Sequence, residues 1–167
     1  TTTGADNVAV GAEALDTNTT GSRSVAIGYQ ALYTSDTASS YNVAVGYKAG
    51  YYTNTGAQNV FAGYAAGKAN TTGSNNIAVG SGALLSNTIG ASNVAIGKTA
   101  LGTNIDGSKA IAIGELALED QEPSGATDTY NIAIGHQAGK DISTSVQNTI
   151  IGGLAGDALT TGSGNTG

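Results

Sequence analysis

The stretch Asn42-Val43-Ala44-Val45-Gly46 returns with small changes along the whole chain. Each copy has a polar residue, two branched aliphatic residues flanking a small one, and a closing glycine. Successive closing glycines lie 17 or 18 residues apart, except for one interval of 21 residues. They are Gly11, Gly28, Gly46, Gly63, Gly80, Gly97, Gly114, Gly135 and Gly152. Nine copies at a nearly fixed period are typical of a solenoid, in which each repeat forms one coil.

The three residues before each closing glycine predict a short strand. In the first copy, Val8, Ala9 and Val10 alternate large, small and large, and β-branched residues at that spacing favour extended backbone. Alternation places the two valines on one face and the alanine on the other. We expect the stacked Val and Ile side chains to fill the coil interior. Parallel coils about 4.8 Å apart would then form a rod about 40 Å long.

The alanine face is left in need of a cover that one coil cannot supply, so we expect another chain to provide it. Phe61 and Ile150 replace alanine in two copies and are predicted to act as plugs in that interface. The predicted interface residues are Ala9, Ala26, Ala44, Phe61, Ala78, Ala95, Ala112, Ala133 and Ile150.

Four positions outside the triplet recur, and two of them, the closing glycine and an asparagine, have structural explanations. The closing glycine would turn the corner with a backbone conformation that side chains disfavour. An alanine always follows three residues later, and the next position is only Leu or Gly. Asparagine precedes seven of the nine triplets and predicts a hydrogen-bonded ladder of amides, because amides without carboxylates bind cations weakly. These residues are Asn7, Asn42, Asn59, Asn76, Asn93, Asn131 and Asn148.

Seven of the eight tyrosines fall in coils two to four. Tyr29, Tyr47 and Tyr64 each follow a closing glycine and would form one column, while Tyr33 and Tyr51 share a second equivalent position. One interpretation is that stacked aromatic rings stabilise the sheet. The other is that these five tyrosines form a platform for a sugar ring or for an apolar patch of a partner.

Composition excludes several classes of function. The net charge is −6, without a basic stripe, so we do not expect nucleic acid as a partner. The chain has no cysteine, which excludes disulfides and thiolate metal sites. No run of about 18 apolar residues is present, so membrane insertion of this segment is not expected. We predict no cofactor, no metal and no catalytic residue.

The longest interval between closing glycines, from Gly114 to Gly135, predicts a protruding acidic loop around Glu122 and the single proline, Pro123. Carboxylates in a loop are unlike a pair held rigidly for acid/base chemistry. His136 is the only histidine and no nucleophile motif accompanies it. A polysaccharide hydrolase acting through Glu119 and Glu122 stays as a minor alternative.

The phrase from Asn93 to Ala100, Asn-Val-Ala-Ile-Gly-Lys-Thr-Ala, resembles the head repeats of trimeric autotransporter adhesins and similar repeats of phage tail fibres. The resemblance extends from about Asn7 to Ala155. It implies a left-handed parallel β-roll assembled as a homotrimer. We expect the alanine face, which needs a cover, to lie at the axis of that trimer. The coil here is longer and has Leu or Gly after the constant alanine. Collagen or matrix binding, known for some adhesin heads, is therefore not carried over to any residue.

We therefore predict a single all-β solenoid domain over residues 1–167, a fragment of a longer fibrous protein. Its predicted function is that of a non-enzymatic trimeric fibre segment of a phage tail or virion appendage, which projects and contacts a glycan or protein receptor of the host. A bacterial trimeric surface adhesin head is the alternative, so the location is the virion or the cell surface. A monomeric glycan-binding or ice-binding solenoid is a further alternative. The ice-binding variant is suggested by threonines at one loop position, Thr20, Thr37, Thr55, Thr72, Thr144 and Thr161.

Overall fold

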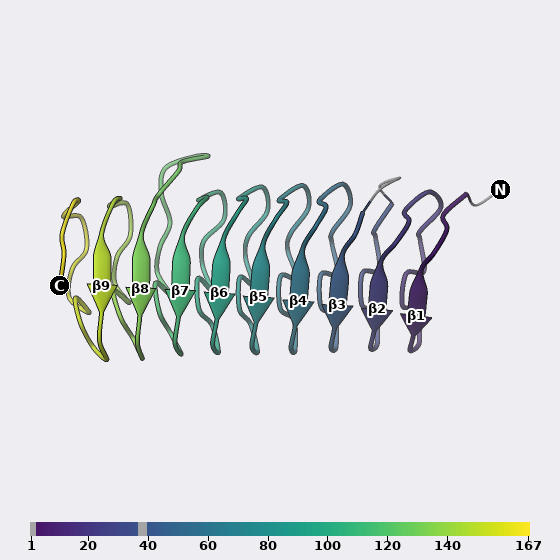
Figure 1. The fold of residues 1–167 in the computed structure, drawn as a ribbon, viewed down its shortest axis with the longest axis horizontal. Helices are drawn as coiled ribbons and strands as arrows, with labels where there is room; N and C mark the ends of the chain where they lie inside the picture. Colours follow the sequence, from purple (N-terminus) through teal and green to yellow (C-terminus); the bar gives the residue numbers. More distant parts are fainter. Residues whose placement is uncertain (1–2, 37–39) are drawn as a thin grey trace.

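The computed structural model describes residues 3–36 and 40–167 and shows a parallel β-solenoid (Figure 1). Thr37 of the threonine row lies outside the described residues. Each triplet forms one strand, and the described part of the chain contains no helix. The strands are β1 (Val8–Val10), β2 (Val25–Ile27), β3 (Val43–Val45), β4 (Val60–Ala62), β5 (Ile77–Val79), β6 (Val94–Ile96), β7 (Ile111–Ile113), β8 (Ile132–Ile134) and β9 (Thr149–Ile151). The all-β solenoid prediction is confirmed.

The nine strands pair in sequence order and in register. Ala78 of β5 pairs with Ala95 of β6, and Ala95 pairs with Ala112 of β7. In-register pairing places equivalent side chains one above another along the rod, as the repeat predicts. Each coil is named below by the strand that it contains.

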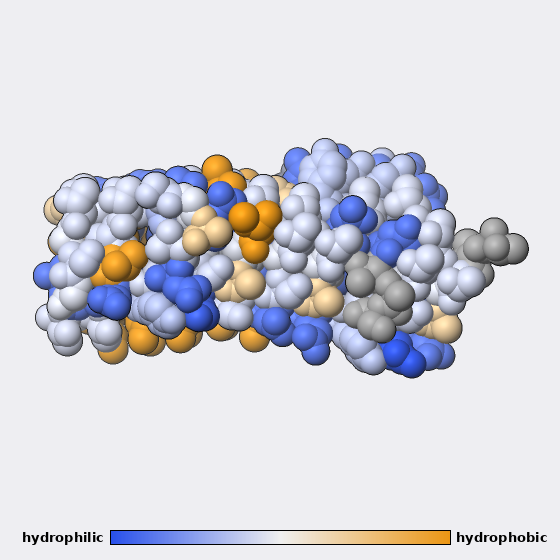
Figure 2. Space-filling view, turned by 90° about the horizontal axis from the view of Figure 1, so that it is seen from above, coloured by the Kyte–Doolittle hydropathy of each residue, from blue (hydrophilic) through white to orange (hydrophobic). Residues whose placement is uncertain are grey.

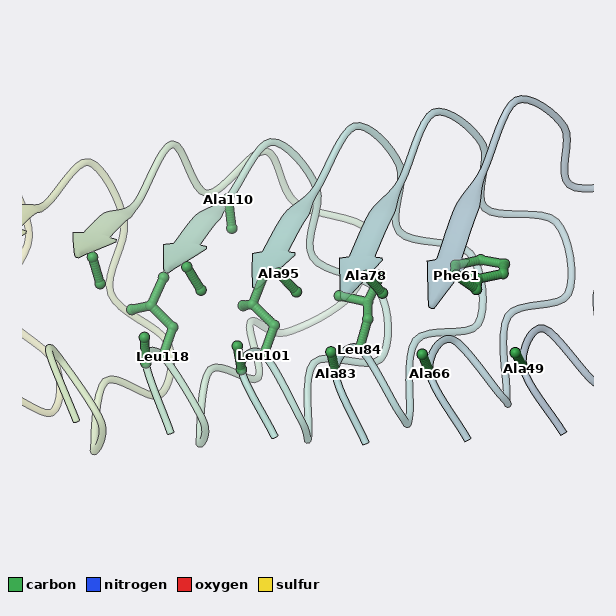
Figure 3. Packing of buried hydrophobic residues seen from close by; sticks show 14 of the residues in the cluster. Ala49, Phe61, Ala66, Ala78, Ala83, Leu84, Ala95, Leu101, Ala110 and Leu118 are labelled. Carbon is green, nitrogen blue, oxygen red and sulfur yellow. The ribbon is translucent and has the colours of Figure 1, made fainter. Parts of the chain in front are cut away.

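The strand faces have the opposite orientation to the one predicted. The central alanines of β2, β3 and β5 to β8 are fully buried inside the chain, whereas Val43, Val45, Ile77 and Val79 point to the outside. The interior is narrow because the opposite wall already fills it with Leu84, among other leucines (Figure 3). Only a small residue then fits on the inner side of the strand. The prediction that Val and Ile fill the interior is wrong.

The corner glycines have the conformation that the repeat predicts. Gly28 has φ 131°, and a Cβ added to it would lie 2.5 Å from the carbonyl oxygen of Gly46 in the next coil. A side chain at this position would therefore meet both an unfavourable φ and the neighbouring backbone. The recurrence of glycine needs no chemical function to explain it.

Buried asparagines connect the coils, which confirms the structural interpretation of the amide row. Asn59 Oδ1 accepts the backbone N–H of Asn76 at 2.8 Å, and Asn59 Nδ2 donates to the carbonyl of Gly73 at 2.9 Å. A second amide row was not predicted. Asn87 Nδ2 donates to Asn70 Oδ1 at 2.9 Å, and Asn104 Nδ2 donates to Asn87 Oδ1 at 3.3 Å. The signal in the sequence was an asparagine three residues before a loop glycine in several repeats, as with Asn87 and Gly90.

Phe61 and Ile150 are part of the core and are not plugs in an interface. Phe61 is fully buried, and Ile150 is 3% exposed. A Cβ added to Gly50 would lie 2.7 Å from Phe61 Cδ2, and one added to Gly67 would overlap the same ring. In the last coil, a Cβ on Gly156 would lie 2.9 Å from Ile150 Cδ1. Glycine after the constant alanine therefore makes room for a large residue on the strand.

Candidate functional site

The main exposed apolar surface is the outer side of the nine strands, called the strand face here. It carries two rows of side chains, mostly Val and Ile, because the first and third residues of each triplet point outward. Its most exposed members are Val8, Val10, Ile27, Val43, Val45, Val60, Ile77, Val79, Ile96, Ile134 and Ile151. Figure 2 shows hydrophobic side chains in a row along the left part of its lower edge, towards the C-terminal end of the rod. Nine strands at about 4.8 Å make this strip about 40 Å long.

The residues predicted to form the trimer axis do not form a surface. Ala9 lies in register with Ala26 and is exposed only because its coil is the first described one. The other predicted contacts are buried within a single chain, so a partner cannot reach them. They are Ala26, Ala44, Phe61, Ala78, Ala95, Ala112, Ala133 and Ile150. Any contact made through the strands must use the Val and Ile side chains.

The tyrosines form the two columns that the spacing predicts. In the first column, the ring centroids of Tyr29 and Tyr47 are 5.4 Å apart and those of Tyr47 and Tyr64 are 5.2 Å apart. The rings of Tyr47 and Tyr64 are almost parallel, with an interplanar angle of 3°. Stacking of equivalent aromatic side chains on adjacent coils stabilises the ladder.

The second column is more enclosed. The rings of Tyr33 and Tyr51 stack at 5.0 Å, and Tyr52 meets the Tyr51 ring edge-on at 4.6 Å. Lys48 Nζ lies between the two columns, 5.3 Å from the Tyr47 ring centroid and 5.5 Å from that of Tyr51. A hydrogen bond with Tyr47 raises the pKa of Lys48, which favours the ammonium form at this position.

Beyond Tyr64, the position after the corner glycine becomes polar. Ser81 follows in the next coil, and then come Lys98, Glu115 and His136. Lys98 Nζ lies 3.2 Å from Glu115 Oε1, and His136 Nδ1 lies 3.8 Å from Glu115 Oε2. These exposed side chains form a line of hydrogen-bonding groups along the same edge as the first tyrosine column.

The acidic loop between β7 and β8 rises beyond the neighbouring loops (Figure 1). Its two predicted candidate carboxylates have different partners. Glu122 Oε2 accepts the backbone N–H of Ile105 at 2.8 Å, and burial raises the pKa of Glu122. Glu119 Oε2 lies 3.9 Å from Lys140 Nζ. The contacts of Glu122 show a structural role, since its carboxylate holds the preceding coil.

The loop also contributes a residue to the core. Gln121 is fully buried and continues the second amide row, because its Nε2 donates to Asn104 Oδ1 at 3.3 Å. Its Oε1 accepts a hydrogen bond of 2.8 Å from Asn131 Nδ2. The base of the inserted loop is therefore anchored, and the exposed tip is Ser124–Ala126.

Among residues 3–36 and 40–167, no group of three or more His, Asp or Glu side chains is placed to hold a metal ion. The same residues include no helix long and apolar enough to cross a membrane. The comparisons with known proteins give no further information. Neither protein-family models, nor curated proteins, nor solved structures match this chain.

Proposed function

We propose that this chain is a non-enzymatic segment of a homotrimeric fibre, in which the strand faces of three identical protomers meet along a common axis. The observation that carries the proposal is the strip of outward-facing side chains along the nine strands, mostly Val and Ile, which are exposed or half-exposed in the single chain. Monomeric soluble proteins rarely leave a continuous apolar surface of this kind open to water. A second and a third copy of the same strip would cover it with matching chemistry and length.

The shape of the chain supports a role as a fibre. Coils in register give a straight rod, and each coil is held to the next by strand pairing and by buried amides. The resemblance of the repeat to adhesin-head and tail-fibre repeats supports three copies and a left-handed winding. Such a rod projects from a virion appendage, or alternatively from a bacterial cell surface, and presents loops and edges to a receptor. Three copies of any contact would add avidity.

Light scattering on the purified segment tests the proposal. The expected mass is three times the 16.3 kDa of the chain. A double variant, Ile77→Asp with Val79→Asp, places two charges on the strand face and should give folded monomers, because a charge buried in an interface without a partner is strongly unfavourable. The matched control is Leu85→Asp, which changes an equally exposed apolar residue outside the strand face and should leave the trimer intact.

The circular dichroism spectrum should be unchanged in both variants, because all three positions are exposed in the single chain. A monomeric parent protein would overturn the fibre proposal and favour the alternative of a monomeric binding solenoid. A stable dimer would show that the strand faces pair directly across a twofold axis.

A further inference from the structure

We infer that the open face of the Tyr64 ring, with the polar groups beyond it, is a binding site for one neutral pyranose ring. The inference rests on the proposed function, since it names the receptor chemistry of the projecting fibre. Within the first tyrosine column, Tyr47 and Tyr64 differ in stacking and in exposure. Tyr47 has a stacked ring on both sides and is 41% exposed, whereas Tyr64 stacks on Tyr47 alone and is 61% exposed. We attribute the greater exposure of Tyr64 to its second ring face, on which no other aromatic ring stacks.

The other predicted platform tyrosines lack such a face. A sugar stacks through its C–H groups on the face of an aromatic ring, and both faces of Tyr47 are covered. Tyr29 also has one ring partner, yet it is no more exposed than Tyr47, at 41%. Tyr33 and Tyr51 are only partly exposed and face each other. Of the five predicted platform tyrosines, Tyr64 is therefore the one with a ring face open to a sugar.

Small residues keep the space beside Tyr64 open. The equivalent residue of the next coil is Ser81, and Gly82 follows it without a side chain. The next large side chain in the row is Lys98, two coils away from Tyr64. Two coil spacings are about 9–10 Å, and stacked carbon atoms lie about 3.5–4.0 Å apart. The gap thus has the width for one saturated six-membered ring between Tyr64 and Lys98.

The far side of the gap has the groups that sugar hydroxyls need. Lys98 donates hydrogen bonds, Glu115 accepts them, and the Ser81 hydroxyl does both. The ion pair between Lys98 and Glu115, at 3.2 Å, balances the charges of these two side chains. The chain as a whole has a net charge of −6, which disfavours acidic sugars. These features select a neutral pyranose over sialic acid or a sulfated sugar.

The test uses saturation-transfer NMR on the assembled protein with methyl β-galactopyranoside, methyl α-glucopyranoside and the methyl glycoside of N-acetylglucosamine. At least one should bind in the millimolar range, with transfer strongest at the ring C–H protons that face Tyr64. Methyl sialoside should bind at least tenfold more weakly. The absence of binding by all three neutral glycosides at about 10 mM would overturn the inference.

Two variants remove the open face in different ways. Tyr64→Leu removes the aromatic ring, and Ser81→Tyr extends the column so that a new ring covers Tyr64. Each should weaken binding about tenfold or more, since the sugar loses both its stacked contact with the ring and the apolar area buried against it. Tyr64→Phe and Ser81→Ala keep the face open and should stay within about threefold of the parent. Unchanged binding by Ser81→Tyr would overturn the inference even if Tyr64→Leu had unfolded.

Light scattering on the same samples separates the two proposals. A trimer that binds none of the neutral glycosides contradicts the sugar site and leaves the fibre standing. A monomer whose binding is lost in Ser81→Tyr contradicts the fibre and leaves the sugar site standing.

Discussion

The coil of β4 and the coils of β5 to β7 fill the same interior space from opposite walls. In β5, β6 and β7 the strand contributes an alanine, and the opposite wall contributes Leu84, Leu101 or Leu118 (Figure 3). In β4 the strand contributes Phe61, and the opposite wall has Gly67 in place of leucine. The volume of the interior is therefore conserved while the residue that supplies it changes.

This comparison explains why the position after the constant alanine is only Leu or Gly. Leu84 and Leu101 have φ of 53° and 51°, and Gly67 has φ of 58°, so the backbone is the same in both kinds of coil. Side-chain volume across the interior decides between them. Phe61 contacts the glycine positions of its own coil and of the preceding one, Gly67 and Gly50. One phenylalanine thus replaces two leucines.

The largest effect is expected from removing Phe61. Phe61→Ala would leave the coils of β3 and β4 with alanine on the strand wall and glycine on the opposite wall. The resulting cavity should lower the free energy of unfolding by about 3–5 kcal/mol. Urea denaturation followed by circular dichroism measures this loss. A change below about 1 kcal/mol would show that the interior collapses around the gap and does not need a constant volume.

The next effect tests the exchange between the two walls. Gly67→Leu adds a side chain where Phe61 already lies and should lower the free energy of unfolding by about 2–3 kcal/mol. Adding Phe61→Ala in the same chain recreates the pairing of Ala78 with Leu84. The double variant should therefore be more stable than Phe61→Ala alone. Additive losses from the two changes would contradict the comparison, because residues that share a space should be coupled.

The smallest expected effect is a change in the pH dependence of stability, which comes from a surface carboxylate and not from the interior. Hydrogen bonds from the side chain of Thr19 and from the backbone N–H groups of Thr19 and Thr20 lower the pKa of Asp36 from 3.8 to about 2. A lowered pKa means that the carboxylate stabilises the fold above pH 4, and that this contribution is lost as the pH falls from about 4 to about 2. Thermal denaturation should show that Asp36→Asn flattens this part of the pH profile. Phe61→Ala should keep the parent's slope there, and a parent-like slope in Asp36→Asn would contradict the assignment.

Much of the fold could be predicted from the repeat. The spacing of Gly80, Gly97 and Gly114 predicted the coils and their register, because equivalent residues must meet when coils of equal length are stacked. Asparagine before the triplet predicted an amide ladder for the same reason. The tyrosine columns followed from equal spacing as well. A one-dimensional architecture makes these local rules sufficient, since each coil contacts only its neighbours.

The direction of the strand faces was decided only by the tertiary structure. Alternation separates Ile77 and Val79 from Ala78, but it does not say which side faces the interior. That choice depended on Leu84, Leu101 and Leu118, which occupy the interior from the opposite wall and leave space there for a methyl group only. The same is true of the candidate sugar site. The sequence determined the column that contains Tyr64, whereas the open face of the ring became visible only when the rings were placed in space.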